Sequence, residues 1–95
     1  MTAMPHTQPL TDDELIEKYI APSPRRGGIA EMVVEPYVIP VWALIGAITL
    51  GGATPEEVTQ EYDISPEAMW ATLAYYRRHE AVIDARIDAN RVGAA

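Results

Sequence analysis

The chain has 95 residues, a formal net charge of −7, a pI of about 4.6 and no cysteine. This length allows one domain with a thin hydrophobic core, and the lack of cysteine excludes disulfides, thiolate metal sites and cysteine nucleophiles. The acidic balance disfavours strong binding of nucleic acid by the chain alone, because phosphate neutralisation requires clustered cations. It favours a basic protein partner.

The N-terminal part is predicted to contain one short helix. Met1–Leu10 has two prolines and no hydrophobic periodicity, and is interpreted as a loose arm. Thr11 and Glu14 have the spacing of a capping box, which predicts an amphipathic helix over Asp12–Ile20. Neither a signal peptide nor a membrane-spanning segment is indicated.

A basic loop and two strands are predicted next. Arg25 and Arg26, followed by two glycines, could contact phosphate or could form a solvated loop. Ile29–Val34 and Tyr37–Ile39 are typical of short strands. The prolines at 36 and 40 suit an edge ribbon, and such a ribbon could pair with a second copy of itself.

Three helices are predicted after the ribbon. Val41–Leu50 is apolar nearly all round, which indicates a buried helix ended by Gly51-Gly52. Thr54-Pro55 and Ser65-Pro66 each combine an N-cap hydroxyl with proline at the first helical position. A short helix, a tight turn and a longer helix form the outline of a helix-turn-helix.

These elements together predict a mainly α fold. Its centre is a three-helix, homeodomain-like helix-turn-helix body with a short N-terminal β-ribbon and a long C-terminal helix. We expect residues 1–28 to form an N-terminal arm with a short amphipathic helix and a basic loop. Residues 29–95 then form the helix-turn-helix domain with its extended last helix.

The apolar face of the predicted last helix changes direction. No helix breaker occurs over Pro66–Asn90, which predicts a helix roughly 37 Å long. The stripe of its first half consists of Met69, Trp70, Leu73 and Tyr76, and it can face the helix-turn-helix body as part of the core. The stripe of its second half is rotated by about a quarter turn. The second stripe needs another cover, which could be the Leu15–Ile20 helix, a second copy of the chain or a different protein. It consists of Tyr75, His79, Val82, Ile83, Arg86 and Ile87.

The sequence indicates a protein without catalytic activity. His6 falls in the arm, and His79 is interpreted as a packing residue. The acidic residues 12–14 are interpreted as complements of the helix dipole, not as a cation site. No phosphate-binding glycine loop and no nucleophile elbow occur, so we expect no catalytic, metal or cofactor site.

DNA binding by the helix-turn-helix is a separate hypothesis. The start of the longer helix, with Ser65 and Glu67, would enter the major groove, and Arg25 and Arg26 would contact phosphate. No Arg or Lys stands near the start of that helix, and Glu67 would be repelled by phosphate. The helix pair is therefore a scaffold, or it binds DNA weakly and with help from a partner.

An ordered set of short motifs covers a little over half of the chain. The motifs are Ile39-Pro40-Val41-Trp42, Gly51-Gly52, Thr54-Pro55-Glu56-Glu57-Val58, Tyr62, Ile64-Ser65-Pro66-Glu67, Leu73-Ala74-Tyr75-Tyr76-Arg77-Arg78-His79 and Ile83-Asp84-Ala85-Arg86-Ile87. In this order they resemble the small helix-turn-helix family catalogued as domain of unknown function four-three-three, whose members look like VapB-type antitoxins. The family's usual G-T-R segment before the first helix is not matched here.

The resemblance implies a cytoplasmic prokaryotic protein, a homodimer, that binds and neutralises a PIN-like ribonuclease toxin. It also implies autoregulatory binding of operator DNA by the complex. The second stripe, Tyr75, His79, Val82, Ile83, Arg86 and Ile87, is the candidate toxin-binding surface. An arginine at 77, 78, 86 or 91 could pair with the carboxylates of the toxin's metal site. The alternatives are a homodimeric DNA-binding transcriptional regulator and a structural dimer module without a toxin.

Overall fold

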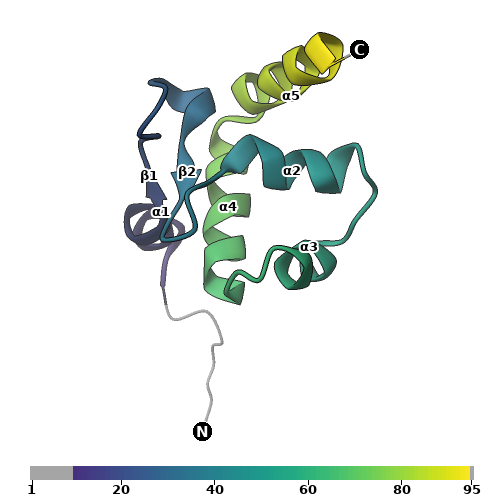
Figure 1. Ribbon diagram of the computed structural model, residues 1–95. Helices are drawn as coiled ribbons and strands as arrows, with labels where there is room; N and C mark the ends of the chain where they lie inside the picture. The colour runs from purple at the N-terminus through teal and green to yellow at the C-terminus, as the bar shows by residue number, and fades with distance from the viewer. Residues whose placement is uncertain (1–9, 95) are drawn as a thin grey trace, which may run out of the picture.

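The computed structural model describes residues 10–94 (Figure 1). Their α-helices are α1 (Asp12–Tyr19), α2 (Val41–Thr49), α3 (Pro55–Glu61), α4 (Pro66–Arg78) and α5 (Glu80–Ala94), and a 3-10 helix, η1, spans Ile29–Glu31. The predicted arm lies outside the described residues except for Leu10. The helix-rich class is confirmed, but the predicted three-helix body with a long C-terminal helix is wrong.

A three-stranded antiparallel sheet takes the place of the predicted ribbon. Its order is β1 (Ile20–Ala21), β2 (Val33–Val34) and β3 (Ile39–Pro40). Ile20 lies opposite Val34, which in turn lies opposite Ile39. The sequence did not reveal β1, because two residues directly after a helix show no alternation of side chains. The predicted regions 1–28 and 29–95 therefore share one sheet and one hydrophobic core.

The predicted helix starts are confirmed. The hydroxyl of Thr11 accepts from the backbone N–H of Glu14 at 3.2 Å, and that of Thr54 accepts from Glu57 at 3.1 Å. Both glutamates return a hydrogen bond to the capping residue, which completes two capping boxes. Ser65 caps α4 with its hydroxyl. Caps depend on residues within one turn, so they could be predicted from the sequence alone.

The predicted continuous helix over Pro66–Asn90 is broken at His79. The backbone there has φ −137° and ψ 36°, which is not helical, and α5 turns away from α4 to lie beside α2 (Figure 1). The reason is the change in direction of the apolar face. A straight helix would leave Ile83 and Ile87 in water, whereas the break reduces their exposure to 0% and 6%. Burying two such side chains contributes about 1.5–3 kcal/mol each, more than the roughly 1 kcal/mol of a lost helical hydrogen bond.

Small side chains form much of the core side of α4. Ala68, Ala71 and Ala74 are buried, and they allow the neighbouring helices to approach α4 closely. The main helices packed on α4 are α1 and α2, whose Leu15 and Leu44 are fully buried. No helix within residues 10–94 is long and apolar enough to cross a membrane.

Candidate partner-binding surface

The stripe predicted to bind a toxin is largely core. Tyr75 is 5% exposed and lies in the same cluster as Ile83 and Ile87. The cover is none of the three that the sequence left open, because α2 and η1 of the same chain pack on α5. The His79 ring lies 4.5 Å from that of Tyr75, and only Val82 of the apolar residues is well exposed. The expectation that the N-terminal helix, a second copy or another protein covers this stripe is therefore wrong.

The arginines considered for a toxin active site are all paired within the chain. Arg77 and Arg78 meet Asp12 and Asp13 of α1. Arg91 meets a neighbouring aspartate on α5 at 3.3 Å. Arg86 is the most enclosed of them: its Nε donates to Glu31 at 2.6 Å. These pairs make an arginine inserted into a partner's carboxylate site an unsupported mechanism.

The four residues predicted to bind DNA are not brought together. Arg25 and Arg26 lie in the loop before η1, where the Ser23 hydroxyl accepts from both of their backbone N–H groups. The carbonyl of Ile29, the first residue of η1, accepts from the Tyr75 hydroxyl at 2.7 Å. That contact holds the loop near the far end of α4, about ten residues or roughly 15 Å from its start.

Ser65 and Glu67, at the start of α4, are occupied by contacts within the chain. The Ser65 N–H donates to the Tyr37 hydroxyl at 2.9 Å. The Glu67 carboxylate accepts from the Tyr19 hydroxyl at 2.8 Å and from Lys18 at 3.3 Å. The Tyr19 hydrogen bond, followed by that of Lys18, lowers the pKa of Glu67. Glu67 thereby holds α1 on α4, and Ser65 holds the turn between β2 and β3 on α4. Neither residue is free to contact a base.

The surface of the α3–α4 pair is acidic. From Thr54 to Tyr76 the chain has five carboxylates and no Lys or Arg: Glu56, Glu57, Glu61, Asp63 and Glu67. All but Glu67 are exposed. Cations elsewhere do not offset this charge, because Arg25 and Arg26 are the only two of the seven Lys and Arg residues that make no ion pair in the described part of the chain.

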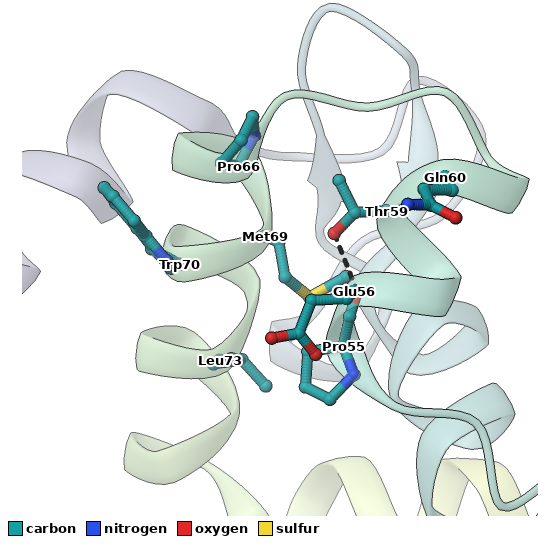
Figure 2. A pocket seen from close by; sticks show the side chains of 8 residues that line it. All are labelled: Pro55, Glu56, Thr59, Gln60, Pro66, Met69, Trp70 and Leu73. Carbon is teal, nitrogen blue, oxygen red and sulfur yellow. Dashed lines mark hydrogen bonds between the residues drawn. The ribbon is translucent and has the colours of Figure 1, made fainter.

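An apolar groove of about 540 Å³ runs between α3 and α4 on this acidic surface (Figure 2). It is lined by Pro55, Glu56, Thr59 and Gln60 from α3 and by Pro66, Met69, Trp70 and Leu73 from α4. Met69 and Leu73 point from α4 toward α3, and the Glu56 carboxylate reaches toward them from the opposite wall. The Thr59 hydroxyl is used internally, since it donates to the carbonyl of Pro55 at 2.7 Å.

Sequence reasoning missed the groove because it assigned Trp70 and Leu73 to the core. Both are half-buried, whereas the fully enclosed positions of α4 are mostly alanines. The signal was present in the spacing: Pro66, Trp70 and Leu73 stand at i, i+4 and i+7 on one face, away from those alanines. Large apolar residues opposite an alanine-rich face indicate a second contact surface.

Two further observations limit the kind of site. Within residues 10–94 no three His, Cys, Asp or Glu side chains are grouped in a way that could hold a metal ion. No protein family, curated protein or solved structure was found to match the chain. The assignment of function therefore depends on the shape and charge of the surface just described.

Proposed function

We propose that this protein is a non-catalytic, antitoxin-like module that binds and neutralises a PIN-like ribonuclease in the cytoplasm. The observation that carries the proposal is the acidic α3–α4 pair, which has four exposed carboxylates, an apolar groove and no Lys or Arg from residue 54 to residue 76. A ribonuclease has to bind the phosphates of its substrate with Lys and Arg side chains. An acidic, partly apolar surface complements such a substrate-binding face in charge.

The proposed mechanism is masking of the ribonuclease's RNA-binding surface. It replaces the insertion of an arginine, because Arg77, Arg78, Arg86 and Arg91 are engaged in ion pairs within the chain. Charge complementarity chiefly increases the rate of association and selects the partner. Inhibition should therefore weaken as salt screens the two surfaces from each other.

A homodimeric DNA-binding regulator is the second candidate. The unpaired guanidinium groups of Arg25 and Arg26 favour it, since they are free to meet phosphate. The acidic helix pair opposes it, because the start of α4 would bring Glu67 and its neighbouring carboxylates toward the DNA backbone. We propose DNA binding only for the complex, with the partner supplying most of the positive surface.

The test is neutralisation of a PIN-like ribonuclease encoded beside this gene, with RNA cleavage as the readout. The test variant reverses two charges on α3, Glu56→Lys with Glu61→Lys. Its control, Glu80→Lys with Glu17→Lys, makes the same change of net charge and also alters one first-turn and one last-turn residue of a helix. Both pairs are exposed, so effects of helix dipoles and overall charge are matched.

We expect the α3 variant to lose inhibition by at least about tenfold and the control to change it by less than about threefold. A mobility-shift assay on upstream DNA, with salt varied, tests the second candidate in parallel. Equal inhibition by both variants, or no inhibition of the ribonuclease by the unchanged chain, would overturn the proposal. Strong, sequence-specific DNA binding by the chain alone would favour the regulator instead.

A further inference from the structure

We infer that the groove between α3 and α4 receives one amphipathic, basic helix of the partner. An apolar side chain of that helix rests on Met69 and Leu73, and a Lys or Arg one turn away meets the Glu56 carboxylate. The inference rests on the proposed function, because it names the recognition chemistry of the same surface. It also stands on its own geometry, so that the two can fail separately.

The shape of the groove suits a helix. Its walls are two helices, and its floor is apolar from Pro66 through Met69 to Leu73, which spans about two turns of α4. A helix lying in such a groove inserts apolar residues spaced i, i+3 or i+4 and i+7. Trp70 also lines the groove and is half-buried, with its ring directed away from α3 (Figure 2); aromatic residues are frequent anchors of protein interfaces.

The charge of the groove selects a cation. Glu56 is exposed and makes no hydrogen bond or ion pair among residues 10–94, although it reaches over the apolar floor (Figure 2). Glu61 and Asp63 add negative charge at the C-terminal end of α3 and in the turn after it. Phosphate groups and acidic peptides would be repelled. A Lys or Arg that covers Glu56 instead forms a charge-assisted hydrogen bond shielded by the neighbouring apolar contacts.

Two occupants from this chain fit less well. A second copy would bring its own acidic α3, with a net charge of −7 per chain, against the same surface. Any homodimer must then use a different face. The first nine residues contain no Lys or Arg, so they offer no side-chain cation permanently charged at neutral pH to Glu56. A foreign basic helix is the occupant that satisfies both the apolar floor and the free carboxylate.

The experiment uses the full chain and two labelled synthetic peptides of about 16 residues. One is an amphipathic helix of Leu and Lys, and its twin has Glu at every Lys position. Binding is followed by fluorescence anisotropy at about 50 and 300 mM salt. The test variant, Leu73→Asp, is compared with Val82→Asp on α5, which is 42% exposed outside the groove. Each substitution adds one negative charge, so unspecific attraction of the cationic peptide is the same for both.

We expect the Leu/Lys peptide to bind and its Glu twin not to bind. Leu73→Asp should weaken binding by more than about tenfold, and Val82→Asp should leave it within about twofold. Glu56→Gln should weaken binding by about three- to tenfold and reduce its dependence on salt, compared with Glu17→Gln as the charge-matched control. Thermal melting of each variant checks that the fold is intact.

Several results would overturn the inference. If the Leu73→Asp and Val82→Asp variants bind the peptide equally, the peptide responds to the net charge of the chain and not to the groove. A dimer in sedimentation that Leu73→Asp dissociates means that a second copy occupies the groove. Tighter peptide binding after removal of residues 1–9 means that the chain's own N-terminus occupies it.

The proposed function has a different failure. If Leu73→Asp still neutralises a PIN-like ribonuclease as well as the unchanged chain does, the groove is not the recognition site but the function stands. If the Leu/Lys peptide binds as expected and no ribonuclease is neutralised, the function fails and the groove keeps its preference for a basic helix.

Discussion

Ile87 on α5 lies against Gly46 on α2: its Cγ2 is 3.8 Å from the point that a Cβ on Gly46 would occupy. This contact lies where α5 packs on α2, and that packing is the reason why the chain bends at His79. The small residue at position 46 leaves room for Ile87, and α2 packs on α5 so that Ile83 and Ile87 are completely or nearly buried. The face that remains free for a partner is consequently on α3 and α4.

Gly46→Ala should stabilise the protein. A methyl group fits at 3.8 Å without a clash, and alanine is favoured over glycine inside a helix by about 1 kcal/mol. Gly46→Leu should destabilise it by about 1–3 kcal/mol, because the larger side chain would push α5 away from α2. Urea denaturation measures both. If α4 and α5 formed one straight helix, residue 46 would face no neighbour on α5 and Gly46→Leu would not destabilise.

Val38 is expected to be strained. It has φ +57° in the turn between β2 and β3, a conformation that is rare for a β-branched residue, and its side chain is 47% exposed. Val38→Gly and Val38→Asn should therefore raise the free energy of unfolding by up to about 1 kcal/mol, since both residues adopt positive φ more easily. Val→Gly in an ordinary extended loop destabilises, so a lower melting temperature for both variants would contradict this account of the turn.

Arg86 should tie α5 to the rest of the fold. Its guanidinium lies 4.3 Å from the centre of the Trp42 ring, and the ion pair with Glu31 leaves the two side chains only 20% and 17% exposed. Arg86→Ala should cost about 2–3 kcal/mol, because Glu31 would be left unpaired and partly buried.

Two further variants separate the ion pair from the stacking on Trp42. Arg86→Lys should cost about half as much as Arg86→Ala, since it keeps the charge but not the planar stack. Arg86→Ala combined with Glu31→Gln should be less destabilised than the sum of the single variants. Strict additivity in chemical denaturation would show that the two residues do not interact.

The contact of α1 with α4 should depend on pH through Glu67. The Tyr19 hydroxyl and then Lys18 lower the pKa of this carboxyl below its ordinary value of 4.5. A group whose pKa is lower in the folded state contributes stability that is present above its unfolded value and lost as the pH falls. The difference in melting temperature between wild type and Glu67→Gln should therefore be largest near neutral pH and shrink below about pH 4.5.

Tyr19→Phe is the control for this pH dependence, because it removes the hydroxyl named first among the causes of the lowered pKa. In that variant the difference made by Glu67→Gln should vary less with pH. A difference that stays constant from neutral pH to about pH 2 in the wild-type background would show that Glu67 is not held as a carboxylate by these partners.

The sequence predicted what depends on neighbouring residues and missed what depends on packing. Thr54 and Ser65 begin helices because their hydroxyls cap the backbone locally, and Gly52 ends α2 with φ +78° as expected. The break at His79 is marked by no helix-breaking residue, only by the change in direction of the apolar face. It arises because burial of Ile83 and Ile87 against α2 stabilises the fold by more than the helical hydrogen bond lost at the break.

The candidate surface could likewise be predicted only in part. The acidic charge of the α3–α4 pair could be counted in the sequence, where no Lys or Arg stands near the start of α4. The spacing of Pro66, Trp70 and Leu73 indicates a second apolar face of α4, but an apolar residue on a helix reads the same whether that face meets the core or lines a groove. The neighbouring wall, supplied by α3, decides it.

The most direct measurement is hydrogen exchange of the chain alone and in complex with a co-expressed PIN-like ribonuclease. The account predicts slower exchange in α3 and in α4 up to Leu73, where the acidic groove would be covered. Backbone amides of α5 should exchange as in the free chain, because Ile83 and Ile87 are already buried against α2. Protection confined to α5, with α3 unchanged, would contradict the account.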